Sequence, residues 1–428
     1  MTYKETIDYL YNAAPAFTKV GAAAYKEGLY NTEELDRHAG HPHRSFLTVH
    51  VAGTNGKGSC SHSLAAILQA AGMKVGLYTS PHLVTFRERV RVNGEMMPEE
   101  YVVDWVERNR SFFEPLSPSF FELTTAMAFE YFREQKVDIA VVEVGLGGRL
   151  DCTNIITPVL SVITNISFDH TQFLGSTLHD IAREKAGIIK KGVPVVVGET
   201  VPETREVFLE VAKRLDAPLF FAEDSRVPLE VDFQLKGSYQ KRNLNTILHC
   251  LLPLARELKN RGVRIPNATK NARYALEHVC DLTGLSGRWQ TVGEKPLVIC
   301  DTGHNVAGWE FLARQITETW EKRAEEFRKQ GQDCHLRIVF GMVDDKDLDT
   351  VLGMLPKNAE MYFTQADTHR AILAEVVREK SATVGLFGRS YATVALAFES
   401  ALADSTPADF IFVGGSSYVV ADFLSSRK

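Results

Sequence analysis

The sequence lacks the features of a disulfide-rich, zinc-finger or membrane protein. Its six cysteines lie far apart in the chain, at Cys60, Cys152, Cys250, Cys280, Cys300 and Cys334. They form no CxxC pair, so we predict neither a zinc site nor a disulfide framework and interpret them as buried thiols. No segment approaches the roughly 20 apolar residues that span a bilayer, and the N-terminal stretch does not resemble a signal peptide. We therefore expect a cytoplasmic protein with no membrane partner.

An excess of positive charge is also missing. The chain has 48 Lys and Arg residues against 54 Asp and Glu residues, a formal net charge of -6. Affinity for a nucleic-acid backbone comes from an excess of Lys and Arg on one face, so we expect no nucleic-acid partner. Hydrophobic residues make up 45% of the chain and charged residues 24%, the balance of an ordinary globular protein. We expect it to fold without partners, as a monomer.

Short apolar runs alternate with longer helical patterns, and this alternation predicts an α/β fold with mostly parallel sheets. A chain of 428 residues favours two domains. We expect strands of the first at 46–51, 74–78, 138–144, 159–164 and 193–197. The second series begins near Pro296 with the strand LVICD, a helix over 306–319 and the strands LRIVFGM, EMYFTQ and DFIFVGG. A glycine-containing stretch before Pro296 favours a boundary near Val292, which gives domains 1–291 and 292–428.

The segment FLTVHVAGTNGKGSCSHSLAAILQAAG has the order strand, glycine-rich loop, helix. Backbone N–H groups of such a loop, with the N-terminus of its helix, bind phosphate. Lys57 would add a positive charge over the β- and γ-phosphates, and Ser59 a hydroxyl at the helix start. The standard pattern has Lys followed directly by Ser or Thr, whereas Gly58 intervenes here. A plain helix-capping turn is the alternative, and the presence of all the parts in order favours phosphate binding. The predicted nucleotide loop consists of Gly53, Thr54, Asn55, Gly56, Lys57, Gly58 and Ser59.

Two further side chains follow expected strands. Glu143 ends the apolar run DIAVVEVG, and His170 comes after the strand VLSVITNI. Both should lie at the carboxyl edge of the sheet, where open α/β sheets bind ligands and where the glycine-rich loop also lies. A lone acid at a strand end is more often solvated, and a lone His is more often an ordinary loop residue. An acid that ends an apolar run is explained most simply as a magnesium ligand.

Lys185 is unusual because of its spacing. In the helix predicted over 176–190, Leu178, Ala182, Lys185 and Ile189 follow one narrow stripe, and the other members of the stripe are apolar. A buried ammonium is costly unless it is paired or neutralised. Two interpretations remain open. Lys185 extends along its apolar stem to water, or its amine is buried because it has a chemical role.

The loop HVAGTNGKGS is similar to the nucleotide loop of the folylpolyglutamate synthase and dihydrofolate synthase family, within the wider Mur ligase group. Further matches follow in the family's order: YTSPHL, FFELTTAMAF, EVGLGGRLD, ITNISFDHTQFLG, REKAGIIK, GRWQ, DTGHN and DDKD. The resemblance implies a P-loop-type ATP-binding domain with a mostly parallel sheet and a smaller, Rossmann-like C-terminal glutamate ligase domain. It also implies an ATP-dependent ligase that adds L-glutamate to folates, and to dihydropteroate, through an acyl phosphate.

The same resemblance implies roles for single residues. Ser80, Glu143 and His170 would hold Mg²⁺, with two ions expected. Lys185 would be carbamylated by carbon dioxide, so that a carboxylate assists the second ion. Together with Lys57, the residues Glu143, His170 and Lys185 would be the catalytic ones.

The remaining implied contacts concern ATP and the pterin ring. Asn243 in GSYQKRNLNTI, Arg288 in GRW and Asp301 in DTGHN would contact ATP, with His304 near the phosphates. The pterin pocket would be lined by Phe120, Phe121, Glu122, Arg149 and Asp151. The two Phe side chains fit a hydrophobic core equally well. For DDKD, which alone would be a charged turn, the residues suggest no role.

The chain departs from the family pattern at three positions. Tyr239 stands where the family usually has His, Cys152 where it often has Ala, and Ser286 where Pro precedes the GR pair. Tyr239 puts the adenine-side details in doubt. GLGGRLD could be mistaken for a dinucleotide fingerprint, but the third glycine of GxGxxG is missing and no clear helix follows at once.

Three rival functions remain to be separated by experiment. A P-loop kinase or NTPase would need no amine substrate. A non-catalytic folate-binding relative would be expected to lose Lys57 or Glu143, and both are present. A Mur-type cell-wall ligase would use a nucleotide-linked peptide, and we see no dedicated domain for that substrate before the loop.

Overall fold

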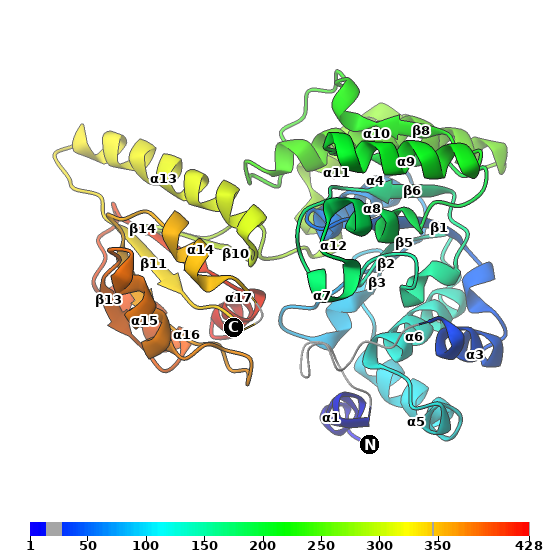
Figure 1. Ribbon diagram of the computed structural model, residues 1–428, viewed down its shortest axis with the longest axis horizontal. Coiled ribbons are helices and arrows are strands. Elements are labelled where there is room, and N and C mark those ends of the chain that lie inside the picture. Colours follow the sequence, from blue (N-terminus) through cyan, green and yellow to red (C-terminus); the bar gives the residue numbers. More distant parts are fainter. Residues whose placement is uncertain (14–27, 345, 428) are drawn as a thin grey trace. The chain divides into compact units, whose positions relative to one another are not determined.

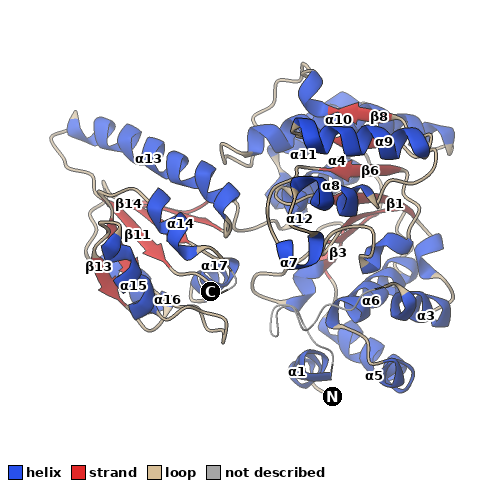
Figure 2. Ribbon diagram, viewed as in Figure 1, coloured by secondary structure: helices blue, strands red, loops and turns tan. Residues whose placement is uncertain are grey.

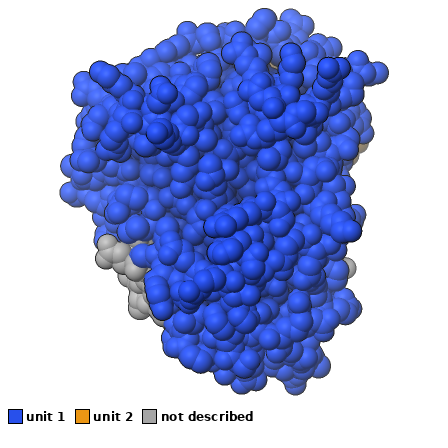
Figure 3. Space-filling view, turned by 90° about the vertical axis from the view of Figure 1, so that its right-hand side faces the viewer, with its two compact units in different colours: residues 1–234, 240–285 blue, residues 235–239, 286–428 orange. Residues whose placement is uncertain are grey.

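The computed structural model describes residues 1–13, 28–344 and 346–427, and Figure 1 shows their helices and strands. The chain forms two compact units. Unit 1 consists of Met1–Gln234 and Gln240–Leu285, and unit 2 of Leu235–Tyr239 and Ser286–Lys428, the blue and orange residues of Figure 3. The chain leaves unit 1 for the last time after Leu285, and the domain limit near Val292 stays a prediction.

Unit 1 is built on an eight-stranded sheet with the order β4-β3-β2-β5-β1-β6-β7-β8. Its strands are β1 (Leu47–Ala52), β2 (Val75–Tyr78), β3 (Val90–Val92), β4 (Glu95–Met96), β5 (Ile139–Glu143), β6 (Leu160–Ile163), β7 (Val195–Val197) and β8 (Leu219–Phe221). The six strands from β2 to β8 pair in parallel, and β3 and β4 add an antiparallel edge. The predicted parallel sheet is confirmed. The short strands β3, β4 and β8 were not predicted.

Helices cover both faces of this sheet, as Figure 2 shows. Apolar side chains on one face pack against α5 (Glu99–Leu116), α6 (Phe120–Glu134), α8 (Leu178–Ala186) and α9 (Pro202–Arg214). The other face packs against α4 (Lys57–Ala70), which in turn contacts α10 (Gln240–Asn260), α11 (Ala268–Glu277) and α12 (Val279–Thr283). The other elements are α1 (Tyr3–Ala13), α3 (Tyr30–His38), η2 (Pro42–Arg44), η3 (Phe86–Arg89), η4 (Cys152–Ile155), α7 (Thr171–Leu174) and η5 (Ala222–Asp224).

Helix α4, which follows the glycine-rich loop, is buried along most of its length. Every residue from Ser59 to Leu68 is buried, because the helix lies between the sheet and α10 to α12. Its sequence KGSCSHSLAAILQA is rich in Ser and Ala, and these small side chains let neighbouring elements approach closely. A helix without a solvent face is held from all sides. The start of α4, and with it the loop, is therefore fixed in position.

Unit 2 contains a six-stranded sheet with the order β13-β12-β11-β14-β10-β9. Its strands are β9 (Gln290–Glu294), β10 (Leu297–Asp301), β11 (Leu336–Phe340), β12 (Glu360–Phe363), β13 (Gly388–Ser390) and β14 (Phe410–Gly414). All pair in parallel except β9. Two apolar clusters flank the sheet and include side chains of α13 (Val306–Arg328), α14 (Leu348–Met354), α15 (Ala374–Thr383), α16 (Val394–Ala403) and α17 (Ser417–Ser425). The second predicted α/β series is confirmed.

Two predicted helices differ from the observed ones. Helix α13 continues to Arg328, beyond the predicted end at 319, because strong helix formers extend past Trp320. Helix α8 is shorter than the predicted 176–190. Its end is set by tertiary contacts: the N–H of Arg149 donates to the Glu184 carbonyl at 2.8 Å, and a Cβ on Gly187 would lie 2.4 Å from Cα of Arg149.

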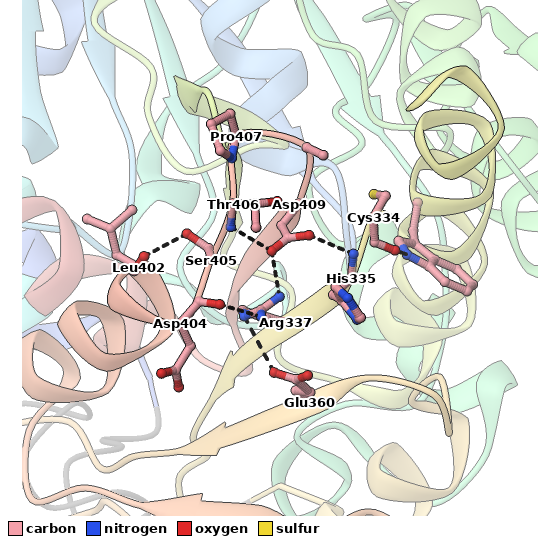
Figure 4. Close-up of polar contacts among 12 residues, drawn as sticks. Cys334, His335, Arg337, Glu360, Leu402, Asp404, Ser405, Thr406, Pro407 and Asp409 are labelled. Atoms are coloured by element: carbon pink, nitrogen blue, oxygen red, sulfur yellow. Dashed lines mark hydrogen bonds and ion pairs between the residues drawn. The ribbon is translucent and has the colours of Figure 1, made fainter. Parts of the chain in front are cut away.

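A buried ion pair joins β11 and β14 where both strands begin (Figure 4). The carboxylate of Asp409 is fully buried and accepts from the Arg337 guanidinium at 2.9 Å. It also accepts from the backbone N–H groups of His335 at 2.7 Å and Thr406 at 2.8 Å. The same guanidinium donates to the Asp404 carbonyl at 2.6 Å. The carboxylate of Asp409 is thus satisfied, whereas Nε of Arg337 has no hydrogen bond among the described residues and lies 3.4 Å from a carboxylate oxygen of Glu360.

Candidate active site

The glycine-rich loop connects the carboxyl end of β1 to the first turn of α4. Gly53 and Gly56 adopt positive φ angles of 149° and 84°. A Cβ on Gly53 would lie 1.8 Å from Oγ1 of Thr164, and one on Gly56 would lie 2.3 Å from Oδ1 of Asn243. Both positions therefore require glycine for space as well as for backbone conformation. The tight turn predicted for phosphate binding is present.

Hydrogen bonds from the segment that follows β6 hold the loop in place. The sequence analysis did not predict them. The N–H groups of Thr54 and Asn55 donate to the carbonyl and side-chain oxygens of Asn165, at 3.0 and 2.9 Å. The hydroxyl of Thr164 donates to the Asn55 carbonyl at 2.5 Å, and Thr54 and Ser167 exchange two hydrogen bonds of 3.1 Å. The partners are about 110 residues apart in sequence, so no local pattern could reveal them. Only their position directly after an apolar strand was a signal.

Two lysine amines meet at one carbonyl of the loop. Nζ of Lys57 donates to the carbonyls of Gly53 and Thr54, both at 3.0 Å. Nζ of Lys185 donates to the same Gly53 carbonyl, also at 3.0 Å. Among the described residues neither amine forms an ion pair with a carboxylate. Two lysine amines thus share one carbonyl oxygen of the predicted phosphate loop.

Lys185 is buried, with a relative exposure of 4%. Burial is the main reason why its pKa falls from 10.5 to about 7, and the positive charge of Lys57 lowers it further, while Asp169 and Asp151 act in the opposite direction. A substantial share of the side chain is therefore a neutral amine near pH 7. The alternative in which Lys185 reaches out to water is wrong, since the amine points into the loop.

The predicted metal-site residues follow neighbouring strands of the sheet. Ser80 comes two residues after β2, Glu143 ends β5, and His170 follows β6 at the start of α7. In the sheet, β2, β5, β1 and β6 are consecutive neighbours, so all three residues and the loop emerge at one carboxyl edge. Glu143 is buried and lies in register with Val51, two residues before Gly53. The alternative in which Glu143 is an ordinary solvated acid is wrong, because its side chain is buried.

Helix α10 supports the loop from the other side. The side-chain amide of Gln240 donates to the hydroxyl of Ser59 at 3.0 Å, and Asn243 donates to Gln240 at 2.8 Å. The side chain of Asn243 packs so closely against Gly56 that it leaves no space for a Cβ atom there. Residues predicted to contact a nucleotide from distant parts of the sequence are thus close together in unit 1. Gln240 was not predicted, although it stands next to the Tyr239 that departs from the family pattern.

Comparison with known proteins decides the family. The description "Mur ligase middle domain" matches residues 51–224, and "Mur ligase, glutamate ligase domain" matches residues 287–417. A dihydrofolate synthase/folylpolyglutamate synthase of Bacillus subtilis is 34% identical over 385 residues, which cover 83% of this chain and 85% of that protein. The enzyme of the same name from Escherichia coli is 34% identical over 380 residues, with 87% and 85% covered. The chain belongs to the dihydrofolate synthase/folylpolyglutamate synthase family.

Solved structures of this family share the fold. The structure of E. coli FolC in complex with DHPP and ADP has a TM-score of 0.79 and 29% identity, and covers 100% of this chain and 98% of that one. A bifunctional folylpolyglutamate synthase/dihydrofolate synthase with Mn, AMPPNP and L-glutamate bound has a TM-score of 0.80 and 28% identity, with the same coverage. The Mur ligase fold expected from the sequence is confirmed. In the described part of the chain no helix is long and apolar enough to cross a bilayer.

Two segments with a predicted role in pterin binding lie against each other in unit 1. The ring of Phe121 stacks on Tyr78, with centroids 5.8 Å apart, and occupies the space of a Cβ on Gly145. Phe120 is buried and stacks on Tyr11 at 4.7 Å, so it belongs to the core as well. Glu122 is also engaged structurally: its carboxylate accepts from the N–H of Ser119 at 2.6 Å and closes the capping box of α6.

The GLGGRLD loop contains one exposed and one buried predicted residue. Arg149 is exposed and forms an ion pair with Glu184 at 2.9 Å. Asp151 is buried; it accepts from the N–H of Leu146 at 2.8 Å and from the hydroxyl of Thr153 at 2.5 Å. That hydroxyl also lies 2.8 Å from Nε2 of His50 on β1. Burial lowers the pKa of His50 to about 3, so a neutral imidazole holds Thr153, which in turn holds Asp151.

In unit 2 the family residues gather at the carboxyl end of β10. Asp301 is buried and accepts from the Tyr239 hydroxyl and the Trp289 N–H, both at 2.7 Å. Burial raises the pKa of Asp301, although the positive charge of Arg288 opposes this. His304 lies two residues after Thr302, whose carbonyl is 3.0 Å from its Nδ1. Tyr239, the residue that replaces the usual His, is thus a direct partner of Asp301.

The DDKD segment is described in part, since Asp345 lies outside the described residues. Asp347 caps α14 by accepting from the N–H of Thr350 at 3.0 Å. Asp344 lies 3.8 Å from Arg370. For these two positions the charged-turn interpretation has a physical basis, because the carboxylate of Asp347 satisfies a free N–H at the helix start.

Proposed function

We propose that the chain is an ATP-dependent ligase that adds L-glutamate to folates and to dihydropteroate through an acyl phosphate. The convergence of Lys57 and Lys185 on the Gly53 carbonyl of a rigid glycine-rich loop is the observation that carries this proposal. Lys57, whose amine has no carboxylate partner among the described residues, is suited to an anionic ligand such as the triphosphate of ATP, while the neighbouring Lys185 is suited to carbamylation. Names and bound ligands of the family members agree with this assignment.

The donor set at the carboxyl edge fits a divalent metal ion. Ser80, Glu143 and His170 would hold it, with a hydroxyl, a carboxylate and an imidazole. Oxygen ligands suit Mg²⁺, while an imidazole is less usual for it and occurs more with transition metals. Divalent ions would neutralise charge on the transferred phosphoryl group. We expect two of them.

Lys185 has the properties needed for carbamylation. Its amine is buried and its pKa is about 7, so the neutral form that attacks carbon dioxide is available near neutral pH. As a carbamate the side chain would carry a negative charge beside Lys57. Repulsion between two cations would then become attraction, and a carboxylate would face the metal site. The burial that makes the ammonium costly thus favours the modified form.

The reaction has two steps. Hydroxide is a poor leaving group, so the substrate carboxylate must first take the γ-phosphoryl group of ATP, which releases ADP. Lys57 would stabilise the charge of the transferred group. The amine of L-glutamate then attacks the acyl carbon, phosphate leaves, and the nitrogen loses its proton to give the amide. N–H groups of the loop and Lys57 hold the anionic groups in place throughout.

The proposed substrate contacts follow the family resemblance. Phe121 and the GLGG turn, which pack on each other, would stack on the pterin ring, and Arg149 and Asp151 would hydrogen-bond it. We propose that Asn243 contacts ATP, and that Arg288, Asp301 and His304 serve the nucleotide as well. We further propose that residues 1–291 and 292–428 are the ATP-binding and glutamate ligase domains of a cytoplasmic monomer.

The direct test measures ADP release with L-glutamate and one pterin substrate at a time. Release that needs both glutamate and either dihydropteroate or a reduced folate, with the matching amide detected by mass spectrometry, supports the proposal. A response to one pterin alone identifies a monofunctional enzyme. ATP turnover that is indifferent to glutamate contradicts the proposal and favours a kinase or NTPase. Lys57→Ala is the control, since it should abolish turnover in every case.

A further inference from the structure

A second cluster of possible metal ligands lies far from the glycine-rich loop along β1. Asp36 is in the last turns of α3, and His41 and His43 belong to the short connection that leads into β1. The loop begins at the carboxyl end of β1, whereas this cluster precedes its amino end. The ligand atoms of the three residues lie within 4.8 Å of one another. The proposed ligase reaction gives this cluster no part.

The three side chains face one another closely. Nδ1 of His41 is 2.6 Å from Oδ2 of Asp36, and Nδ1 of His43 is 2.5 Å from Oδ1. The two imidazole rings are nearly perpendicular, at 88°, with centroids 6.1 Å apart. Each carboxylate oxygen thus has its own imidazole nitrogen. If these two short contacts open, a single ion between the three side chains would bond to two imidazole nitrogens and one carboxylate.

The backbone fixes this arrangement. The N–H of His41 donates to the carbonyl of Asp36 at 2.8 Å, and His41 adopts the left-handed region, with φ 56° and ψ 55°. Such a conformation is uncommon for a residue other than glycine. Pro42 then starts η2, and Arg133 of α6 donates to the carbonyl of Ala39. Ligands held by a rigid connection lose little freedom when they bind an ion.

The three side chains differ in how much of their surface is exposed to solvent. The side chain of Asp36 is 7% exposed and that of His43 is 12% exposed, whereas His41 is 39% exposed. The carboxylate is thus shielded from water, while the cluster remains open on the side of His41. Burial opposes ionisation of Asp36, but hydrogen bonds from His43 and His41 outweigh it and lower its pKa. The carboxylate is therefore charged at neutral pH.

We propose that Asp36, His41 and His43 bind one divalent transition-metal ion of the zinc class. Two imidazole nitrogens and one carboxylate oxygen are typical ligands of such an ion, with water in the remaining position. The hard ion Mg²⁺ prefers oxygen ligands and is not expected here. On binding, Nδ1 of each imidazole gives up to solvent any proton that it carries, and its hydrogen bond with Asp36 is replaced by a bond to the metal. The ion would fasten the end of α3 to the start of β1.

The test uses the full-length protein after removal of metal by a chelator. Calorimetry with Zn²⁺ and visible spectra with Co²⁺ are recorded in excess Mg²⁺ and ATP, which occupy the nucleotide site. Wild type is compared with the variants His43→Gln and Asp36→Asn. His335→Gln is the matched control, because His335 is an exposed histidine of unit 2. Glu143→Ala tests whether the signal comes from the ligase site instead.

Wild type, His335→Gln and Glu143→Ala should each bind one equivalent that gives a nitrogen-ligated Co²⁺ spectrum. His43→Gln and Asp36→Asn should bind it at least about 100-fold more weakly. Zn²⁺ should raise the Tm of the first three proteins and not of the last two. Equal binding by all five overturns the proposal and leaves a hydrogen-bonded link without metal. For variants that fail to fold, a Zn²⁺-soaked crystal of wild type decides: an anomalous peak between the three residues supports the site, and its absence refutes it.

Discussion

Unit 1 and unit 2 each bring ionisable side chains together, fully buried in unit 2 and partly buried in unit 1, and the two groups are built on opposite principles. In unit 2, Arg337 and Asp409 neutralise each other and receive further hydrogen bonds from the backbone (Figure 4). In unit 1, Lys57 and Lys185 bring two amines, with no carboxylate partner among the described residues, to the single carbonyl of Gly53. The Arg337–Asp409 pair lies at the amino ends of two strands. The two lysine amines lie at the carboxyl end of a strand.

The difference separates a structural charge from a functional one. A buried pair of opposite charges, such as Arg337 and Asp409, needs no further charge from a ligand. Two neighbouring amines repel each other when both are protonated, and this repulsion falls when an anion binds or when Lys185 becomes a carbamate. Perturbed pKa values cluster at functional sites for this reason. The five predictions below test the distinction, starting with the lysine pair of unit 1.

Replacement of Lys185 by Ala should lower glutamate-dependent ADP release by about 10³-fold, since charge stabilisation of phosphoryl transfer is lost. Short carboxylic acids should restore part of the activity if a carbamate is the missing group. Steady-state kinetics with and without added acid measure both effects. Unchanged activity would show that Lys185 has no role in the reaction.

The same position provides a stability readout that depends on pH. The pKa of Lys185 is lower in the folded protein than in the unfolded chain, so the buried ammonium destabilises the fold most at pH 7 and below. The penalty shrinks as pH rises from about 7 to about 10.5, where the amine is neutral in both states. Lys185→Met should therefore stabilise the protein at pH 7, and the gain should fade toward pH 10. Urea unfolding across this range, in buffer purged of carbon dioxide, measures the gain.

Substitution of Gly56 by Ala should weaken ATP binding by at least about tenfold, or 1.4 kcal/mol. The new Cβ would lie 2.3 Å from Oδ1 of Asn243, so the loop would have to shift. Gly72→Ala is the matched control, because Gly72 has a similar φ of 87° but no atom within 4 Å of its Cβ position. This variant should lose about 1–2 kcal/mol of stability, because alanine is unfavourable in a left-handed backbone conformation. It should keep its affinity for ATP. Calorimetric titration with an ATP analogue compares the two variants.

Truncation of Arg337 to Ala should destabilise the protein by about 3–5 kcal/mol, because the charge of Asp409 would remain buried and unpaired. The expected result is a lower midpoint of urea unfolding, with ATP affinity retained under conditions where the protein is folded. Arg389→Ala is the control: its ion pair with Asp404 is exposed, and its loss should cost less than about 1 kcal/mol. If both variants lost the same stability, the buried pair would not be a special support of unit 2.

A last effect is expected at Thr153, whose hydroxyl links His50 to Asp151. Thr153→Val should cost about 1–3 kcal/mol of stability, since two buried polar groups lose a partner. It should also raise the KM for the pterin substrate and leave that for ATP unchanged, because Asp151 would lose its orientation. The exposed pair of Thr350 and Asp347 has a similar hydrogen-bond pattern, and Thr350→Val should change neither KM. An equal change in both KM values would mean a general loss of structure.

Local patterns in the sequence predicted a large part of this site. Continuous apolar runs identified the interior strands, and those strands placed Glu143 and the glycine-rich loop at one edge. The stripe on α8 correctly indicated that Lys185 is buried, although Ile189, its last member, lies beyond the observed end of the helix. Motif resemblance supplied the family. These successes have a common basis, because each depends on residues close together in the chain.

What the sequence could not predict depends on distant contacts. Asn165 and Thr164 hold the loop across about 110 residues of sequence, and the only local signal was their position directly after an apolar strand. Glu122 and Asp151 were predicted from resemblance as substrate contacts, and the structure shows their carboxylates engaged with backbone N–H groups. Their roles toward substrate stay predictions. Strands β3 and β4 were not predicted, although Asn93–Gly94 between them is the pattern of a two-residue hairpin turn and forms one in the structure.

The assignment of Leu235–Tyr239 to unit 2 has a practical consequence. The polypeptide crosses between the units three times, so no single cut separates it into two complete pieces. A recombinant fragment that starts at Ser286 would leave the Asp301 carboxylate without the Tyr239 hydroxyl. Chimeras that exchange C-terminal halves between relatives should therefore transfer this five-residue insert together with the half it serves.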